Sequence, residues 1–227
     1  MQVVIPTRDE AENVGALLDA LREEPEARIT VVDGAGFDET ASIARGAGAR
    51  VIREERAGKG FAVIAGLQAC DPGPVFLCDA DVSGVAPEAI KELFRLARDR
   101  RAPVARLSMG RSPPDAPVTT LVGRPLLAAL GLAELSEPLG GLGIVDRDFV
   151  LEQHLPGGWG FDAALTVAAI AAREELPELP VTGVRHRAKD LSAYVEMAEE
   201  VVFALLRARG IIGWTHEDCV LCRRNGR

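Results

Sequence analysis

The feature that most constrains the fold is an alternation of short β-branched runs with amphipathic stretches in the first half of the chain. Gln2 to Ile5 is a compact apolar run that ends at Pro6, which is typical of a buried strand. From Glu10 to Glu23 apolar residues recur at the spacing of a helix that buries one face. Further strands are predicted at 28–32, 49–53 and 74–78, and further helices at 38–47, 60–70 and 87–101. This alternation predicts an α/β fold with a mostly parallel sheet and helices on both faces.

Polar residues stand where three of these predicted strands end. They are Pro6-Thr7-Arg8, Asp33-Gly34 and Asp79-Ala80-Asp81. In open α/β sheets ligands bind outside the carboxyl ends of the strands. We therefore expect the three clusters to meet at one edge of the sheet.

The second half of the chain is less regular. Strands are expected at 104–109 and 179–184, and helices at 118–130 (interrupted by Pro125), at 161–174 and, the longest, at 191–209. The sequence contains no internal repeat, low-complexity segment or long linker. We expect a single domain, 1–227, whose two halves, 1–101 and 102–227, share one core.

Composition excludes several classes of protein. The chain has 26 basic and 34 acidic residues and a net charge of −8, which argues against a general nucleic-acid binder. Its apolar runs are shorter than the ~20 residues of a membrane span, and its start does not resemble a secretory signal. Four cysteines in 227 residues do not form a disulfide scaffold, so a cytoplasmic protein is expected.

Asp79 and Asp81 are the first candidate ligand pair. Two carboxylates two residues apart, at the open end of a strand, can hold a hard divalent cation and leave positions for phosphate oxygens. The same pattern also occurs as a polar strand exit that caps the next helix, and the motif alone does not decide between the two.

Lys59 lies between Gly58 and Gly60, after one strand and at the start of a helix. Glycines let the backbone approach a phosphate, and a helix start favours an anion. A lysine in a surface turn is the alternative. Asp33 can accept from a base or a ribose, or can be part of a simple turn.

Three candidates come from the second half. His186 is either a metal ligand or an ordinary surface or core histidine. Asp162 follows the glycine-rich segment 157–160, and it either caps a helix or serves as a base beside a substrate. Cys219 and Cys222, with His216 nearby, form half of a zinc pattern, for which a non-functional tail is the favoured interpretation.

Taken in order, these segments resemble those of the GT-A glycosyltransferases. The opening run Val3-Val-Ile-Pro-Thr-Arg-Asp-Glu is similar to their first strand and nucleotide loop. Val32-Asp-Gly-Ala-Gly-Phe-Asp-Glu-Thr, Gly58-Lys-Gly-Phe-Ala and Asp79-Ala-Asp complete the pattern. The resemblance implies a Rossmann-like GT-A fold in which 1–101 binds a nucleotide sugar and 102–227, with its long helix, faces the acceptor.

The second half is similar to the glucosyl-3-phosphoglycerate and mannosyl-3-phosphoglycerate synthases. Val118-Thr-Thr-Leu-Val-Gly-Arg-Pro resembles their acceptor-side helix, and Glu137-Pro-Leu-Gly-Gly resembles the loop beside their donor sugar. Gly158-Trp-Gly-Phe-Asp stands where that family has Gly-Tyr-Gly-Val-Glu, and Gly183-Val-Arg-His-Arg matches the segment that supplies a histidine to its metal site.

The resemblance implies a role for each matching residue. The nucleotide-sugar site would comprise Pro6, Thr7, Arg8, Glu10, Asp33, Gly34, Lys59, Asp79, Ala80, Asp81, Leu139 and Gly140. Mg²⁺ or Mn²⁺ would bind Asp79, Asp81 and His186, and the acceptor would contact Thr119, Gly141 and Arg185. Asp162 and Lys59 would be catalytic, with Asp162 one methylene shorter than the family's glutamate.

Three departures affect the substrates. Pro117 stands where the family has an arginine suited to the acceptor phosphate, for which Arg111, Arg124 and Arg185 are possible substitutes. Ala188 replaces an asparagine, and Asp33-Gly-Ala-Gly replaces a serine-containing turn. The first two concern the acceptor and the third concerns the base.

The expected activity is metal-dependent transfer of a hexose, with retention, from a nucleotide diphosphate sugar to a small hydroxy acid. UDP-glucose is the favoured donor, and 3-phosphoglycerate or a related compound is the expected acceptor. Two alternatives are a polyprenyl-phosphate sugar transferase and a catalytically weak nucleotide-sugar binding protein. We expect a homodimer without a membrane span.

Overall fold

The computed structural model describes the chain except residues 111–114, 133, 174, 187–190, 214 and 216–227. Its centre is a seven-stranded sheet with the order β3-β2-β1-β4-β7-β6-β8. The strands are β1 (Gln2–Thr7), β2 (Arg28–Gly34), β3 (Arg50–Glu54), β4 (Pro74–Leu77), β6 (Val104–Ser108), β7 (Gly143–Asp146) and β8 (Glu178–Pro180). The pairs that join β1, β2, β3 and β4 are all parallel, and β7 is antiparallel to both of its neighbours. The predicted mixed α/β class is therefore confirmed.

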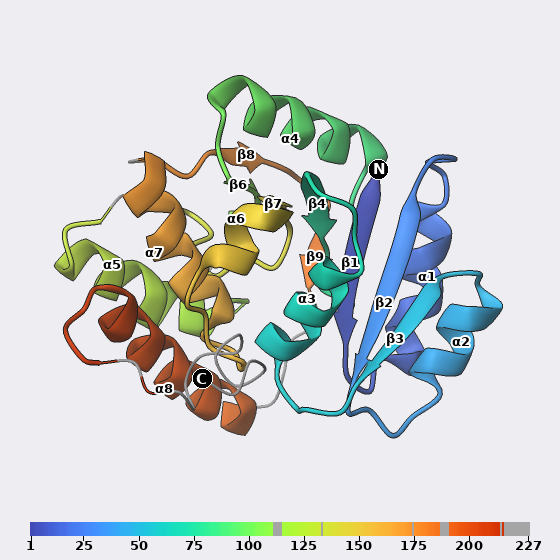
Figure 1. Ribbon diagram of the computed structural model, residues 1–227, viewed down its shortest axis with the longest axis horizontal. Coiled ribbons are helices and arrows are strands. Elements are labelled where there is room, and N and C mark those ends of the chain that lie inside the picture. The colour runs from blue at the N-terminus through green and yellow to red at the C-terminus, as the bar shows by residue number, and fades with distance from the viewer. Residues whose placement is uncertain (111–114, 133, 174, 187–190, 214, 216–227) are drawn as a thin grey trace.

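Helices cover both faces of this sheet (Figure 1). They are α1 (Ala11–Leu21), α2 (Thr40–Gly46), α3 (Lys59–Gln68), α4 (Pro87–Arg100), η1 (Thr119–Gly123), α5 (Arg124–Ala129), α6 (Arg147–Glu152), α7 (Phe161–Arg173) and α8 (Leu191–Ala208). Side-chain alternation along β1 shows how the layers form, because Val3 and Ile5 pack with α1 and α4 whereas Val4 packs with α3. Two apolar cores result, one on each face.

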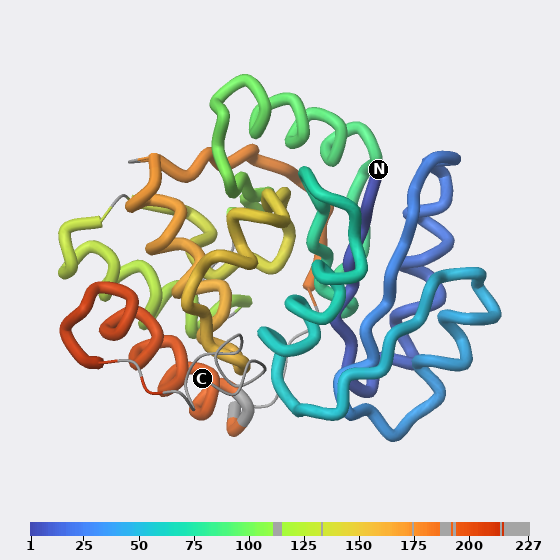
Figure 2. The backbone as a smooth tube through the Cα atoms, viewed as in Figure 1, coloured from blue at the N-terminus to red at the C-terminus, as the bar shows by residue number. Residues whose placement is uncertain are grey.

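The helices of the second half gather at one end of the molecule. In Figure 2 the red-orange tube of α8 lies against α7, and the two helices are in contact. Val201, Ala204 and Leu205 bury the inner face of α8 in the same core as α3 and α7. None of the helices in the described ranges is long and apolar enough to cross a membrane.

One prediction for the second half needs correction. The strand expected at 179–184 is wrong: β8 ends at Pro180, and the chain turns at Gly183 (φ +81°) before β9 (Arg185–His186). The partner strand β6 ends at Ser108, whose carbonyl accepts from the N–H of Val181 at 2.8 Å, so β8 has no strand to pair with beyond this point. The helix expected at 118–130, with an interruption at Pro125, is confirmed: η1 and α5 follow one another there, and the turn before Pro125, which has no N–H, is widened.

The short strand β9 belongs to a separate, two-stranded sheet. β9 pairs antiparallel with β5 (Val82–Ser83), and His186 lies opposite Val82. β5 follows directly on Asp81, so this pairing brings a histidine from late in the chain to the carboxyl end of β4.

Candidate active site

One cavity of about 300 Å³ lies at the carboxyl ends of β1, β2 and β4. The three polar clusters predicted to meet at this edge all contribute to its wall, through Thr7, Gly34 and Asp79 among others. The structure brings most of the predicted site residues together here: Pro6, Thr7, Arg8, Glu10, Gly34, Lys59, Asp79, Ala80, Asp81, Thr119, Leu139, Gly141, Asp162 and His186. Asp33, Gly140 and Arg185 are the predicted residues that do not line it.

Asp79, Asp81 and His186 form a group that can hold a metal ion. One ligand atom from each residue lies within 4.8 Å of the other two. His186 Nε2 is 3.2 Å from Asp81 Oδ1, and the Asp81 side chain is 7% exposed. The Nδ1 atom of His186 is buried and has no hydrogen-bond partner among the described residues. Two carboxylates and an imidazole are ligands that Mn²⁺ and Mg²⁺ accept in proteins.

Lys59 connects this group to Asp162. Its Nζ lies 2.7 Å from Asp79 Oδ1 and 2.7 Å from Asp162 Oδ2. The lysine side chain is 10% exposed and that of Asp162 is 8% exposed, so both charges are largely removed from water. The two candidate catalytic residues therefore meet directly, although they are 103 positions apart in the sequence.

Close backbone packing sets the position of Lys59. A Cβ on Gly58 would lie 2.4 Å from the carbonyl oxygen of Gly157, and a Cβ on Gly60 would lie 2.1 Å from that of Pro156. The N–H of Phe61 donates to the Gly157 carbonyl at 3.0 Å. Glycines on either side of Lys59 are thus required for the start of α3 to meet the segment that leads into α7.

Burial and neighbouring charges shift the pKa values of Lys59 and Asp162 in opposite directions. Burial lowers the pKa of the Lys59 ammonium, but the charges of Asp162 and Asp79 more than offset it, so the pKa is raised and the lysine is cationic. Burial raises the pKa of the Asp162 carboxyl above its ordinary value, and the nearby cations Lys59 and Arg106 only partly oppose this. The Asp162 carboxylate therefore depends on these two cations for its charge in a water-poor site.

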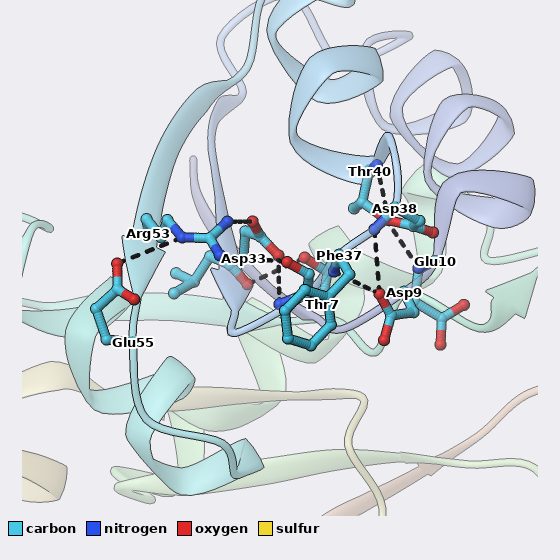
Figure 3. A network of polar contacts seen from close by, with 11 residues as sticks. Thr7, Asp9, Glu10, Asp33, Phe37, Asp38, Thr40, Arg53 and Glu55 are labelled. Atoms are coloured by element: carbon cyan, nitrogen blue, oxygen red, sulfur yellow. Dashed lines mark hydrogen bonds and ion pairs between the residues drawn. The ribbon is translucent and has the colours of Figure 1, made fainter.

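Asp33 is engaged in a network beside the cavity (Figure 3). Its Oδ2 accepts from Arg53 at 2.8 Å, and its Oδ1 accepts from the N–H of Gly36 at 3.2 Å. In the same network Asp9 Oδ1 accepts from the N–H of Phe37 at 2.8 Å, which ties the β1 loop to the turn after β2. Gly34, the next residue after Asp33, is the one that reaches the cavity wall.

Sequence inspection missed one wall of the cavity. Trp159 lines it from the segment before α7, and Tyr194, Met197 and Val201 line it from α8. Their helical spacing is that of an ordinary core stripe, so the sequence gives no signal that separates these α8 residues from their neighbours. Glu200 holds this wall in place, because its Oε2 accepts from the N–H of Trp159 at 2.6 Å.

Some candidates cannot be placed. Arg111, Ala188, His216, Cys219 and Cys222 lie outside the described residues. Of the two other arginines considered for an acceptor phosphate, Arg124 donates from Nε to the carbonyl of Ser136 at 3.0 Å, and Arg185 is exposed on β9.

Comparison with known proteins assigns the family. A sequence profile of glycosyl transferase family 2 matches residues 2–121, more than half of the chain. The chain belongs to glycosyl transferase family 2. It is therefore a glycosyltransferase, as the motifs predicted.

Two relatives of this family member match different shares of the chain. A glucosyl-3-phosphoglycerate synthase from Mycolicibacterium paratuberculosis is 26% identical over 245 residues, which cover 93% of this chain and 73% of that protein. A glycosyltransferase from Mycobacterium tuberculosis is 40% identical over 111 residues, 46% of this chain and 50% of its own length.

A solved structure confirms the predicted GT-A likeness. Glucosyl-3-phosphoglycerate synthase from Mycobacterium tuberculosis, in complex with Mn²⁺, UDP-glucose and phosphoglyceric acid, superposes with a TM-score of 0.83 at 25% identity. The superposition covers 93% of this chain and 80% of that one. The resemblance of this family 2 member to these synthases, stated above from its motifs, is thus confirmed.

Proposed function

We propose that the protein transfers a hexose, with retention, from a nucleotide diphosphate sugar to a small hydroxy acid. UDP-glucose is the favoured donor, and the acceptor belongs to the small hydroxy acids related to 3-phosphoglycerate. The observation that carries the proposal is the meeting, in one cavity, of Asp79, Asp81 and His186 with Lys59 and Asp162. The relatives support it, because the similar solved structure contains UDP-glucose and phosphoglyceric acid.

The donor is proposed to occupy the edge formed by the first half of the chain. Pro6, Thr7, Arg8 and Glu10 follow β1 at this edge and would contact the nucleotide. Leu139 lines the part of the wall that would face the sugar, and Gly141, two residues later in the same segment, would face the acceptor.

The residues present fit a divalent cation. His186 Nδ1 is a buried acceptor without a partner in the described structure, and two carboxylates stand within reach of the same point. Asp79, Asp81 and His186 would hold Mn²⁺ or Mg²⁺. The cation would supply positive charge that offsets the negative charge developing on the leaving diphosphate. Lys59 adds a second positive charge at the same place.

In the transfer, the acceptor oxygen forms a bond to C1 of the hexose while the bond from C1 to the diphosphate oxygen breaks. The electron pair of that bond leaves with the nucleoside diphosphate. We place Asp162 beside the acceptor hydroxyl, whose proton passes to the leaving diphosphate, and Asp162 orients that hydroxyl as a hydrogen-bond acceptor. Retention requires the acceptor to attack from the face on which the diphosphate leaves.

The acceptor side of the cavity favours a compound without a phosphate. Pro117, Val118, Met109 and Met197 line it, none of which can bind an anion through its side chain. Asp115 adds a carboxylate to the same wall. Within the class of small hydroxy acids, we therefore expect unphosphorylated members to be preferred over 3-phosphoglycerate.

A ligand screen tests the proposal without knowledge of the acceptor. Melting temperature is measured with UDP- and GDP-sugars in the presence of Mg²⁺, Mn²⁺ or EDTA, because a ligand that binds the native state raises it. The proposal predicts stabilisation by at least one nucleotide sugar that depends on the metal and is lost in Asp81→Ala. Failure of every nucleotide sugar to stabilise the wild-type protein would contradict it.

A further inference from the structure

Arg106 is a charged side chain buried at the centre of the molecule. It lies in the middle of β6, all of whose residues are buried, and it is 2% exposed. Burying a guanidinium is costly unless its N–H groups are hydrogen-bonded. Burial lowers the pKa of this arginine, a change that the charges of Asp162 and Glu178 oppose.

The guanidinium donates to two separate segments of the chain. Its Nη1 donates to the carbonyl of Glu137 at 3.1 Å and also to that of Pro138. Its Nη2 donates to the carbonyl of Asp162 at 3.0 Å. One side chain therefore joins the residues just before Leu139 to the first turn of α7.

Thr166 completes this arrangement. Its Oγ1 lies 2.6 Å from Arg106 Nη1, 2.6 Å from the Pro138 carbonyl and 2.8 Å from the Asp162 carbonyl. A hydroxyl has one hydrogen, so it donates to only one of these carbonyls while it accepts from the arginine. Among the side-chain donors in the described structure, only Arg106 is then left for the other carbonyl.

Both of these segments reach the candidate active site. Leu139 and Gly141 line the cavity just after the two carbonyls, and the Asp162 side chain lines it at the start of α7. We propose that Arg106 is a positioning residue, which fixes the sugar-side segment and Asp162 relative to each other for hexose transfer. This inference rests on the proposed function.

An ordinary core role would not require a charge at this position. The neighbours Ala105 and Leu107 are apolar and fully buried on the other face of the sheet, where they pack under α4. Replacing a buried ion pair as a whole by apolar residues is often neutral or stabilising, although removing one partner alone is costly, so a buried charge is weak evidence for stability alone. Misplacement of reacting groups by about 1 Å can cost roughly 100-fold in rate, which gives a positioning role a large effect.

The test compares Arg106→Met and Arg106→Lys with the wild-type protein. Transfer from UDP-glucose is measured together with the affinities for UDP and for UDP-glucose, all with Mn²⁺. Arg106→Met is expected to lower kcat by about 100-fold. It should also reduce the affinity advantage of UDP-glucose over UDP, while UDP itself binds within about threefold of wild type because its expected contacts lie on β1 and β2. Arg106→Lys, which keeps the charge, should restore part of the rate.

Two further variants separate positioning from stability. Leu107→Val removes core volume from the same strand on the opposite face and should leave kcat unchanged. Thr166→Val removes only the hydroxyl, and it should lower kcat by about tenfold even if Arg106→Met does not fold.

Two results would overturn the inference. One is an Arg106→Met or Thr166→Val protein with wild-type kcat, and the other is an affinity for UDP that falls in parallel with the rate in the Arg106 variants. Either result, in an active wild-type protein, removes the positioning role and leaves the proposed function standing. A wild-type protein that transfers no hexose overturns the proposed function, and this inference with it.

Discussion

Lys59 and Asp162 form a nearly buried ion pair, with 2.7 Å between Nζ and Oδ2. The pair joins the start of α3 to the start of α7 and thereby connects the two halves of the chain. Lys59 also contacts Asp79, so one ammonium separates two carboxylates that would otherwise repel each other. The first prediction follows from this dependence.

Replacing Lys59 with methionine should leave two carboxylates without their cation. Breaking a largely buried pair from one side typically costs about 3–5 kcal/mol of stability. We expect Lys59→Met to lower the melting temperature and to reduce donor turnover by about 100-fold or more, as removal of a charge-stabilising group does. Lys91→Ala is the matched control, because Lys91 is 53% exposed and pairs only with Glu24 at 2.6 Å among the contacts described. Equal losses in both variants would contradict the assigned role of Lys59.

Gly141 allows the loop to pass against a proposed metal ligand. A Cβ at this position would lie 1.8 Å from Asp79 Oδ2, so Gly141→Ala must displace that carboxylate. We expect the variant to need at least tenfold more Mn²⁺ for half-maximal activity, because one ligand is moved. Gly46→Ala serves as the control, since its added methyl group would meet nothing within 4 Å. A metal requirement that is identical in the two variants would show that Asp79 does not bind the cation.

Glu200 makes the stability of the folded protein depend on pH. Burial raises the pKa of its carboxyl, and the hydrogen bonds from the N–H groups of Trp159 and Gly160 only partly oppose this. A carboxyl whose pKa is higher in the folded state favours folding most when it is protonated, and that contribution is lost as pH rises through the folded pKa. The stability of wild type relative to Glu200→Gln should therefore fall as the pH rises above about 4.5, the ordinary pKa of a glutamate, as measured by urea unfolding. A relative stability that rises with pH over this range would contradict the assignment.

The lining of the acceptor side predicts substrate preference. An arginine–phosphate contact typically contributes about 1.5–3 kcal/mol, or roughly one to two orders of magnitude in affinity. With Pro117 in the wall and Arg124 bonded to Ser136, we expect 3-phosphoglycerate to be a poorer acceptor than glycerate. The assay compares glycerate, 3-phosphoglycerate and simple polyols at one saturating donor concentration. Should 3-phosphoglycerate exceed the others by a hundredfold, the interpretation of Pro117 is wrong, and Arg111→Ala becomes the next variant to make.

Much of the fold could be predicted because parallel strands and amphipathic helices have distinct periods. The ends of β1, β2 and β4 were located closely enough to predict that Thr7, Gly34 and Asp79 share one edge, and the cavity confirms this. His186 lies close to Asp81 because β5 pairs with β9. Two-residue strands leave no periodic signal, so only the family resemblance pointed to that pair.

Other parts of the site could not be predicted from the sequence for physical reasons. Tyr194 and Met197 have the spacing of a core stripe, and only packing shows that they border a cavity. Arg106 stands in a strand where a charged residue normally indicates an exposed face, yet it is buried because carbonyls from two distant segments surround it. Such partners are set by tertiary structure alone.

The most direct measurement is hexose transfer from UDP-glucose to a mixture of small hydroxy acids, monitored through the release of UDP. Wild-type protein is assayed with Mn²⁺ and with EDTA, and Asp81→Ala is assayed with Mn²⁺. We predict acceptor-dependent release that EDTA abolishes and that the variant reduces by at least 100-fold, since Asp81 is a proposed metal ligand. Undiminished release in EDTA, or a variant as active as wild type, would contradict the assignment of Asp79, Asp81 and His186 as the metal site of this glycosyltransferase.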